Sequence, residues 1–373
     1  MINLKYSKRA LIIINLITLL FTIFIEVYET LLPFILVNVF SVSMFIVGIV
    51  EGSSEALSNL LKIFGGYVSD IKSRKNLIIV GLGFLSLSNI TIFIASKWQE
   101  VLFSSYLKSL SEGLLIPAKD FILSNIYKRS LGKVFALNKI FENFGEFLGI
   151  LVALIISSYF VKFLSIKSIF LIFGFICVFF ILILLTINFD RKIKKERKEI
   201  SWRIIYPELL LYFFVLSFVN LGYSFYIIKV YEYLKSQPES IGIYLVFSIF
   251  LVIFTYLAGR LHDRVSLRIF LMIISILFFA SNLLIILNPI IGFLILAVAE
   301  AFLEINIWAT IGKKIKYRKG FVFGLYHFVV GIGSFISALI AGYIWDNFSS
   351  NYPFLISAFI SLFSLGFIVR IKI

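Results

Sequence analysis

The sequence is poor in charged residues and in proline. Charged residues occupy 15% of its 373 positions and hydrophobic residues 61%, whereas charged residues make up about 25% of a typical soluble domain. Such a chain has too little polar surface to be a soluble globular protein. With only six prolines and 22 glycines, it leaves little room for long disordered linkers. The composition therefore indicates a chain surrounded by lipid.

Cysteine and histidine are too scarce for several kinds of chemistry. The single cysteine, Cys177, excludes an intrachain disulfide, and two histidines, His262 and His327, cannot supply a His-Glu-x-x-His metal site. The sequence also lacks a Gly-x-Ser-x-Gly nucleophile motif and a phosphate-binding loop. We therefore expect a protein that is not an enzyme and needs no metal and no cofactor.

In place of polar segments the sequence has long hydrophobic runs. A helix needs about 20 apolar residues to cross the hydrocarbon core of a bilayer. The first run follows a basic stretch but contains no small-residue cleavage site, so we expect a retained helix and not a signal peptide. The ninth and tenth runs divide at Asn288-Pro289. The candidate spans are residues 9–33, 42–66, 76–95, 99–127, 132–158, 165–187, 205–229, 241–261, 268–287, 290–311, 320–344 and 352–371.

The lysines and arginines predict how these spans are oriented. At the ends of the spans and between them, 26 basic residues lie on one side, and only five lie on the other: Lys97, Lys162, Lys167, Lys229 and Lys235. Because positively charged loops stay in the cytoplasm, both termini are predicted to be cytoplasmic in a multi-pass protein of the cell membrane. The formal net charge of +15 then reflects topology, and we expect no nucleic-acid partner.

The chain divides into two halves that resemble each other. A charged run at residues 189–203 separates six spans in residues 1–188 from six in residues 204–373. The segment that begins at Gly132 recurs 188 positions later at Gly320, and Gly-x-Phe recurs in the same register within both spans. Repeats of this kind are typical of transporters built from related halves. The sequence therefore predicts an all-α membrane protein with twelve transmembrane helices in two pseudo-symmetric six-helix bundles, joined by a cytoplasmic basic linker.

A second repeated segment follows the second and eighth spans. It resembles the cytoplasmic loop signature of the major facilitator superfamily, Gly-x-Leu-Ala/Ser-Asp-Arg/Lys-x-Gly-Arg-Arg/Lys. The first copy matches at Gly66, Ser69, Asp70, Arg74 and Lys75, and departs at Val68, Ile71 and Ser73. The second copy keeps Gly259, Leu261, Asp263, Arg264 and Arg268, and departs at Ser266 and Leu267.

Two further segments, 113–120 and 324–331, resemble a prokaryotic branch of this superfamily whose members mostly have no assigned substrate. The resemblance implies two halves that rock about a central site by rocker-switch alternating access, with the first, fourth, seventh and tenth helices around the cavity. It also implies that the loop signatures act in gating. Gly66 would then allow close backbone approach, and Asp70 would face the N-terminus of the eleventh helix, which stabilises a carboxylate by about 0.3–1 kcal/mol.

Charged residues inside the spans are the strongest functional signal. Each costs from about 2.5 kcal/mol upward at the bilayer centre, so it needs a partner or a cavity. Spacing along one helix allows Lys108 to pair with Glu112 and Lys139 with Glu142. Other glutamates come in pairs three or four residues apart: Glu26 with Glu29, Glu51 with Glu55, and Glu300 with Glu304. Two nearby carboxylates in a low dielectric cannot both stay ionised cheaply, so one of each pair should hold a proton.

These arguments give the candidate site. The proton-coupling or cavity candidates are Glu26, Glu51, Glu55, Glu112, Glu300 and Glu304. Further cavity candidates are Lys108, Lys139, Glu142, His327 and Trp308. For any single glutamate the alternative stays open that a base on another helix neutralises it.

Eleven acidic residues against four basic ones inside the spans favour a cationic or neutral substrate over an anionic one. We expect a secondary transporter that acts as a monomer in the lipid bilayer and exports small lipophilic or cationic compounds in exchange for protons. The alternative is a carrier of a neutral metabolite such as a sugar or another small organic solute. A channel is disfavoured because nothing resembles a filter, and a substrate-free receptor because the intramembrane glutamates are retained.

Overall fold

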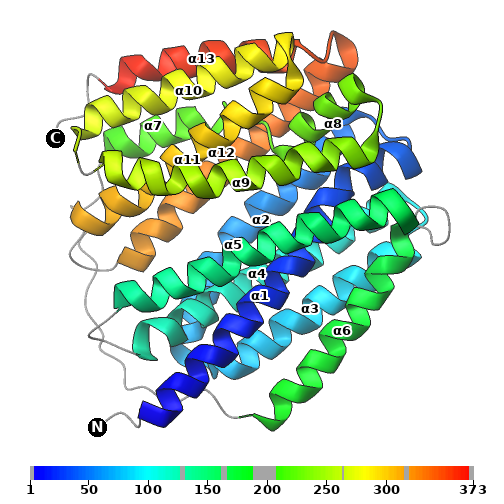
Figure 1. The fold of residues 1–373 in the computed structure, drawn as a ribbon, viewed down its shortest axis with the longest axis vertical. Coiled ribbons are helices and arrows are strands. Elements are labelled where there is room, and N and C mark those ends of the chain that lie inside the picture. The colour runs from blue at the N-terminus through cyan, green and yellow to red at the C-terminus, as the bar shows by residue number, and fades with distance from the viewer. Residues whose placement is uncertain are drawn as a thin grey trace. The chain divides into compact units, whose positions relative to one another are not determined.

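The computed structural model contains helices and connecting turns throughout the part of the chain that it describes. The described residues are 4–126, 131–160, 166–187, 207–262, 264–314 and 319–368. Figure 1 shows the elements, which are α1 (Leu4–Phe34), η1 (Ile35–Val39), α2 (Met44–Ile71), α3 (Arg74–Ile94), α4 (Trp98–Ile126), α5 (Leu131–Ile155), η2 (Ile156–Phe160), α6 (Ile166–Thr186), α7 (Pro207–Ser217), α8 (Tyr223–Leu234), α9 (Gln237–His262), α10 (Leu267–Leu287), α11 (Pro289–Lys314), α12 (Lys319–Asn347) and α13 (Tyr352–Ile368).

The chain forms two compact units. Unit 1 consists of Met1–Ile35 and Leu57–Lys198, and unit 2 of Leu36–Ala56 and Glu199–Ile373. The division therefore passes through α2, whose first half packs within unit 2. The bundles proposed from the sequence, 1–188 and 204–373, stay a prediction, and the linker at 189–203 lies outside the described residues.

Nine of the described helices are long and apolar enough to cross a membrane. Among the others, α4 has 29 residues but carries five charged side chains, and α13 has 17 residues. The predicted boundary between the ninth and tenth spans is confirmed, because α10 ends at Leu287 and α11 begins at Pro289. These findings establish a polytopic all-helical membrane protein, and the count of twelve spans stays a prediction.

The seventh predicted span is broken, so the expectation of one continuous helix was wrong. Helix α7 ends at Ser217 and α8 begins at Tyr223. Gly222 adopts a φ of 96°, which a residue with a β-carbon rarely adopts. The Asn220 side-chain oxygen accepts a hydrogen bond from the N–H of Gly222 at 3.2 Å. A residue within the break thus satisfies one of the backbone donors that the break leaves without a helical partner. Hydrophobicity alone did not reveal this interruption.

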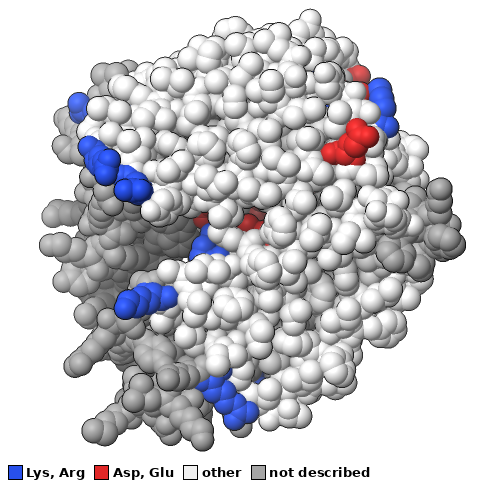
Figure 2. Space-filling view, viewed as in Figure 1, with Lys and Arg blue, Asp and Glu red and all other residues white. Residues whose placement is uncertain are grey.

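The outer surface suits a lipid environment. On the face that Figure 2 shows, uncharged residues dominate and lysine, arginine, aspartate and glutamate are few. Large apolar side chains such as Phe64, Phe179, Tyr256 and Phe363 are exposed. A soluble monomer rarely exposes so many large apolar side chains, whereas lipid tails accept them without penalty.

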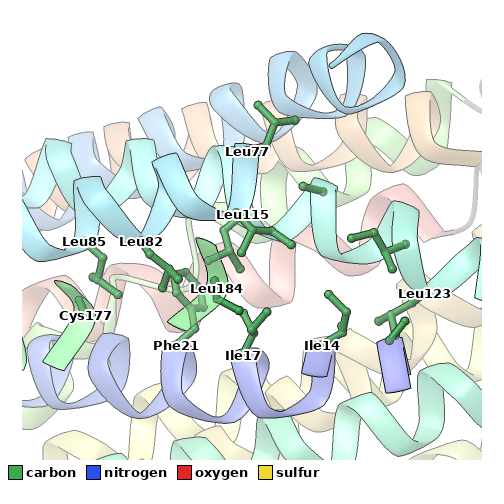
Figure 3. Close-up of a cluster of buried hydrophobic side chains, with 14 of the residues drawn as sticks. Ile14, Ile17, Phe21, Leu77, Leu82, Leu85, Leu115, Leu123, Cys177 and Leu184 are labelled. Atoms are coloured by element: carbon green, nitrogen blue, oxygen red, sulfur yellow. The ribbon is translucent and has the colours of Figure 1, made fainter. Parts of the chain in front are cut away.

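A hydrophobic core joins α1, α3, α4 and α6 within unit 1. Ile14, Ile17 and Phe21 lie three or four residues apart on α1, so one face of that helix is apolar. Figure 3 shows this face directed at side chains from the other three helices. They include Leu82, Leu85, Leu115, Cys177 and Leu184. Cys177 is therefore a packing residue of this core.

Two glycines set the crossing of α2 and α4 in unit 1. A β-carbon on Gly65 would collide with the carbonyl oxygen of Gly113, and one on Gly113 would collide with the β-carbon of Leu61. At Gly66, where the sequence suggested close approach, a β-carbon would meet no atom within 4 Å. The close contact thus belongs to Gly65, and that expectation for Gly66 was wrong.

Replacing Gly113 with alanine is expected to destabilise the protein by about 1–3 kcal/mol, because an added methyl group forces a tightly packed contact apart. The matched control is Gly83→Ala on α3, where a β-carbon would meet no atom within 4 Å and alanine favours the helix. Denaturant unfolding of the purified protein in detergent measures both. Equal stability of the two variants would contradict the packing argument.

Within unit 2, the first half of α2 packs closely on α12. A β-carbon on Gly48 would collide with the carbonyl oxygen of Ala338, and one on Gly342 would lie 2.5 Å from the carbonyl oxygen of Met44. The two carboxylate oxygens of Asp346 accept the N–H groups of Met44 at 2.9 Å and Phe45 at 2.8 Å. Asp346 therefore satisfies the N-terminus of α2, a favourable place for a carboxylate.

Candidate functional site

Lys108 of α4 is the centre of a buried ion-pair network in unit 1. Its Nζ lies 2.5 Å from Glu29 Oε1 on α1 and 3.4 Å from Glu112 Oε1 on the next turn of α4. The Ser58 hydroxyl of α2 donates to the other Glu112 oxygen, and the Tyr28 ring centroid lies 5.7 Å from the ammonium. Lys108 is 7% exposed and Glu112 9%. Two acids and one base thus share this network.

The network confirms one predicted ion pair and shows one glutamate neutralised by a base on another helix. The ion pair of Lys108 and Glu112 occurs as their spacing predicts. Glu29, which the sequence paired with Glu26, is instead neutralised by Lys108 from another helix. Glu26 itself is buried, and its β-carbon lies against Gly149 where α1 meets α5.

A second group of charges follows two to three turns further along α4. Lys119 Nζ lies 3.9 Å from Asp120 Oδ1 and 3.8 Å from Glu142 Oε2 of α5. Lys139 Nζ lies 3.7 Å from Glu142 Oε1, as the spacing of these two residues predicts. Lys119 is buried, whereas Lys139 and Glu142 are partly exposed. Lys108, Lys119 and Lys139 therefore each lie among acidic partners.

Unit 2 has a different arrangement, centred on Glu300 of α11. Asn220, in the break between α7 and α8, donates to Glu300 Oε1 at 2.8 Å, and the Tyr223 hydroxyl hydrogen-bonds to Glu300 Oε2. Glu300 is 9% exposed and interacts electrostatically with the carboxylates of Glu55 and Glu304. Among the described residues, no lysine or arginine forms an ion pair with Glu300. Its partners are neutral hydrogen-bonding groups.

Glu51 lies at the same helix break. Its Oε1 accepts the N–H of Ser224 at 3.2 Å in the first turn of α8, and a β-carbon on Gly222 would lie 3.0 Å from its carboxyl carbon. A carboxylate at this position satisfies a free backbone donor and interacts favourably with the helix dipole. Glu51 and Glu300 therefore both border the interrupted span, whereas Glu55, one turn after Glu51 on α2, is exposed.

The remaining cavity candidates are His327, Trp308 and Glu304. The His327 ring packs on Tyr326, with ring centroids 5.3 Å apart. Trp308 lies on α11, but its side chain is outside the described residues. Glu304, one turn beyond Glu300 on α11, is partly buried.

The loop-signature residues of the first repeat make contacts within unit 1. The Arg74 guanidinium lies 4.1 Å from the centroid of the Phe121 ring, an arrangement that suits a cation on an aromatic face. Lys75 Nζ donates to the carbonyl oxygen of Leu185 at 3.0 Å, near the end of α6 where a cation interacts favourably. The side chain of Asp70 lies outside the described residues.

In the second repeat, the structure describes Gly259, Leu261, Arg264 and Arg268 of the signature. A β-carbon on Gly259 would meet no atom within 4 Å, and the side chains of Arg264 and Arg268 are exposed. Asp263 lies outside the described residues. The gating role of both copies stays a prediction.

Sequence reasoning did not select Asn220 or Ser58, although each binds a carboxylate from another element. A polar residue within an otherwise apolar run is the signal that could have found them, because a buried polar group needs a partner. Within the described residues, no group of three or more histidine, cysteine or acidic side chains is arranged to hold a metal ion.

The comparisons with known proteins agree with this architecture. A family model described as Major Facilitator Superfamily matches residues 14–338 and, a second time, 209–372. A relative from Methanocaldococcus jannaschii, described as an uncharacterized MFS-type transporter, is 28% identical over 366 residues, which cover 91% of this chain and 89% of the relative.

Solved structures share the fold at low sequence identity. A bacterial homolog of the human lysosomal transporter Spinster, in an inward-facing and unoccupied conformation, has a TM-score of 0.80 at 15% identity, covering 98% of this chain and 96% of that chain. The nucleoside transporter NupG has a TM-score of 0.79 at 13% identity and covers 99% of both chains. Because the family model spans more than half of the sequence, this protein belongs to the Major Facilitator Superfamily of membrane transporters.

Proposed function

We propose that this protein is a proton-coupled secondary transporter that exports small lipophilic or cationic compounds by rocker-switch alternating access. The observation that carries this proposal is the setting of Glu300, whose two oxygens contact Asn220 and Tyr223. A tyrosine hydroxyl donates to a carboxylate and accepts from a carboxylic acid, and an asparagine amide donates to either form. Both protonation states of Glu300 are thus satisfied, as a proton carrier requires.

The distribution of charge in unit 2 favours a positively charged cargo. Its candidate glutamates are Glu51, Glu55, Glu300 and Glu304, and the sequence has no lysine or arginine in residues 36–56, 269–312 or 320–368. A proton or an organic cation relieves the repulsion between Glu300 and its acidic neighbours. An anion would increase the negative charge in a low dielectric. Protons and cationic compounds therefore compete naturally for this region.

The second candidate function is transport of a neutral metabolite such as a sugar or another small organic solute. The charges of unit 1 favour it, because Lys108 and Lys119 are matched by acidic partners. The similarity of fold to a nucleoside transporter is compatible with this alternative.

The positive-inside distribution supports a location in the cell membrane with both termini in the cytoplasm. We further propose that a single chain is the transporting unit, since both predicted bundles are on one polypeptide.

Purified protein in liposomes that contain a pH-sensitive dye tests the function. We expect an organic ammonium compound to trigger a proton signal that protein-free liposomes lack. Sugars and nucleosides applied under the same conditions test the second candidate. Movement of an ammonium compound without any proton signal would contradict proton coupling, and movement of a sugar or nucleoside alone would favour the neutral-metabolite carrier.

A further inference from the structure

Lys62 is a basic residue inside the second span that lacks a direct ion pair. It lies on the half of α2 that belongs to unit 1, and its Nζ donates to Asn59 Oδ1 at 3.3 Å. Within the part of the chain that the structure describes, no carboxylate lies within 4.0 Å of this ammonium. An ammonium has three donors, so two stay available. A charge inside a membrane span that lacks an ion pair normally faces a cavity or a ligand.

The crossing of α2 and α4 positions this side chain. Gly65 and Gly113 allow the two backbones to touch, and Lys62 lies one turn before Gly65. The same crossing brings Ser58, one turn before Lys62, into contact with Glu112. Ser58 and the partly buried Lys62 therefore lie on the side of α2 that is directed at α4.

Three carboxylates interact with the charge of Lys62 at longer range. Its charge interacts with Glu112, with Asp120 and with Glu142. Each of them has a nearer cation, because Lys108 pairs with Glu112, and Lys119 with the other two. Lys62 thus links the two groups of charges along α4 without being fixed to either.

This environment selects the chemistry of a ligand. Four bases, Lys62, Lys108, Lys119 and Lys139, balance the four acids Glu29, Glu112, Asp120 and Glu142. A bound anion would add an unbalanced negative charge in a low dielectric, and a cation would be repelled by the ammonium itself. An oxygen that carries no net charge, as in a hydroxyl, carbonyl or amide group, accepts a hydrogen bond from the ammonium without either penalty.

We propose that Lys62 and Asn59 form a subsite in unit 1 that binds an uncharged hydrogen-bond acceptor of the transported molecule. The proposal goes beyond the proton site at Glu300, because it specifies a hydroxyl, carbonyl or amide group as a part of the cargo. It does not depend on the coupling ion.

Thermal unfolding of the full-length protein in detergent tests this subsite. The probes are D-xylose, D-glucose, uridine and adenosine, with gluconate as an anionic analogue of glucose and tetramethylammonium as a small cation. We expect at least one neutral probe to raise the Tm of the wild type by about 2 °C or more. Lys62→Met should lose this rise, whereas Lys62→Gln, which keeps an N–H donor, should retain part of it. The control is Lys97→Met, because Lys97 is exposed and lies outside the spans. This variant should respond to the probes like the wild type.

A second measurement tests the subsite independently of any folding defect in Lys62→Met. In a Cys177→Ser background, the Lys62→Cys variant should react rapidly with a water-soluble methanethiosulfonate, because the subsite must be reached by water. Absence of this reaction would overturn the proposal, since it would place the side chain in lipid or in packed protein. So would an undiminished Tm rise in Lys62→Met, or a panel in which no neutral probe stabilises the wild type.

Discussion

The Glu300→Gln variant is expected to abolish proton-coupled transport while the protein stays folded. Glutamine has nearly the same shape and keeps hydrogen-bonding atoms for Asn220 and Tyr223, which contact the two carboxylate oxygens. It cannot bind or release a proton in the physiological range. The repulsion from Glu55 and Glu304 is also removed, so the folded state loses little stability. Loss of function in this variant therefore reports on the proton and not on the fold.

Liposomes with an internal pH dye measure this effect directly. The proton signal evoked by an organic ammonium compound should fall to the level of protein-free liposomes. Downhill movement of the same compound should persist, because the binding region keeps its shape. Glu239→Gln is the matched control, since Glu239 is exposed in the first turn of α9 and should leave the signal unchanged. A full proton signal in Glu300→Gln would refute Glu300 as the coupling residue.

The same experiment distinguishes Glu300 from the other glutamates. In unit 1, Glu112 is paired with Lys108 and bound by Ser58, so its charge has a fixed partner. In unit 2, Glu51 binds the N-terminus of α8, so its ionised form has a structural role. Glu300 combines neutral hydrogen-bonding partners with acidic neighbours. If Glu112→Gln abolished the proton signal and Glu300→Gln did not, the coupling site would be in unit 1.

Hydrophobic length predicted the helices well because crossing a bilayer is a local requirement. A run of about 20 apolar residues satisfies it whatever the rest of the chain does. The break between α7 and α8 was missed because Phe218, Val219 and Leu221 are as apolar as the flanking helices. Only Asn220 and Gly222 distinguish it, and glycine is frequent in membrane helices that are not broken. The partners of Asn220 and Gly222 come from α11 and α2, and no local pattern contains them.

The ion pairs also show that local sequence patterns do not reveal contacts between helices. Lys108 with Glu112 and Lys139 with Glu142 were predictable, because three or four residues along a helix bring side chains to one face. Glu29 with Lys108 was not, because 79 positions separate them and only the packing of α1 on α4 joins them. The sequence could give the numbers of acidic and basic residues in the spans. Which acid each base neutralises depends on helix contacts, and this decides which glutamates can carry a proton.

The largest expected effect on stability comes from Lys108→Met. Methionine fills much of the lysine volume but removes the cation that Glu29 and Glu112 share. Breaking a buried ion pair by removing one partner costs about 3–5 kcal/mol, because a charge stays buried without compensation. The loss should appear in chemical unfolding of the purified protein in detergent. Lys97→Met, at an exposed lysine, should change the free energy of unfolding by less than about 0.5 kcal/mol.

A second substitution separates charge from packing. In the double variant Lys108→Met with Glu112→Gln, the more buried carboxylate is neutral, and the remaining one, Glu29, is less buried, with 36% of its side chain exposed. The double variant should therefore recover more than half of the stability that Lys108→Met loses, although it changes one more residue. If both variants were equally unstable, the loss would come from packing around the lysine stem, and Lys108 could not be regarded as the counter-ion of Glu112. Recovery would show that the network in unit 1 is held by charge balance, which is the condition on which a neutral ligand at Lys62 depends.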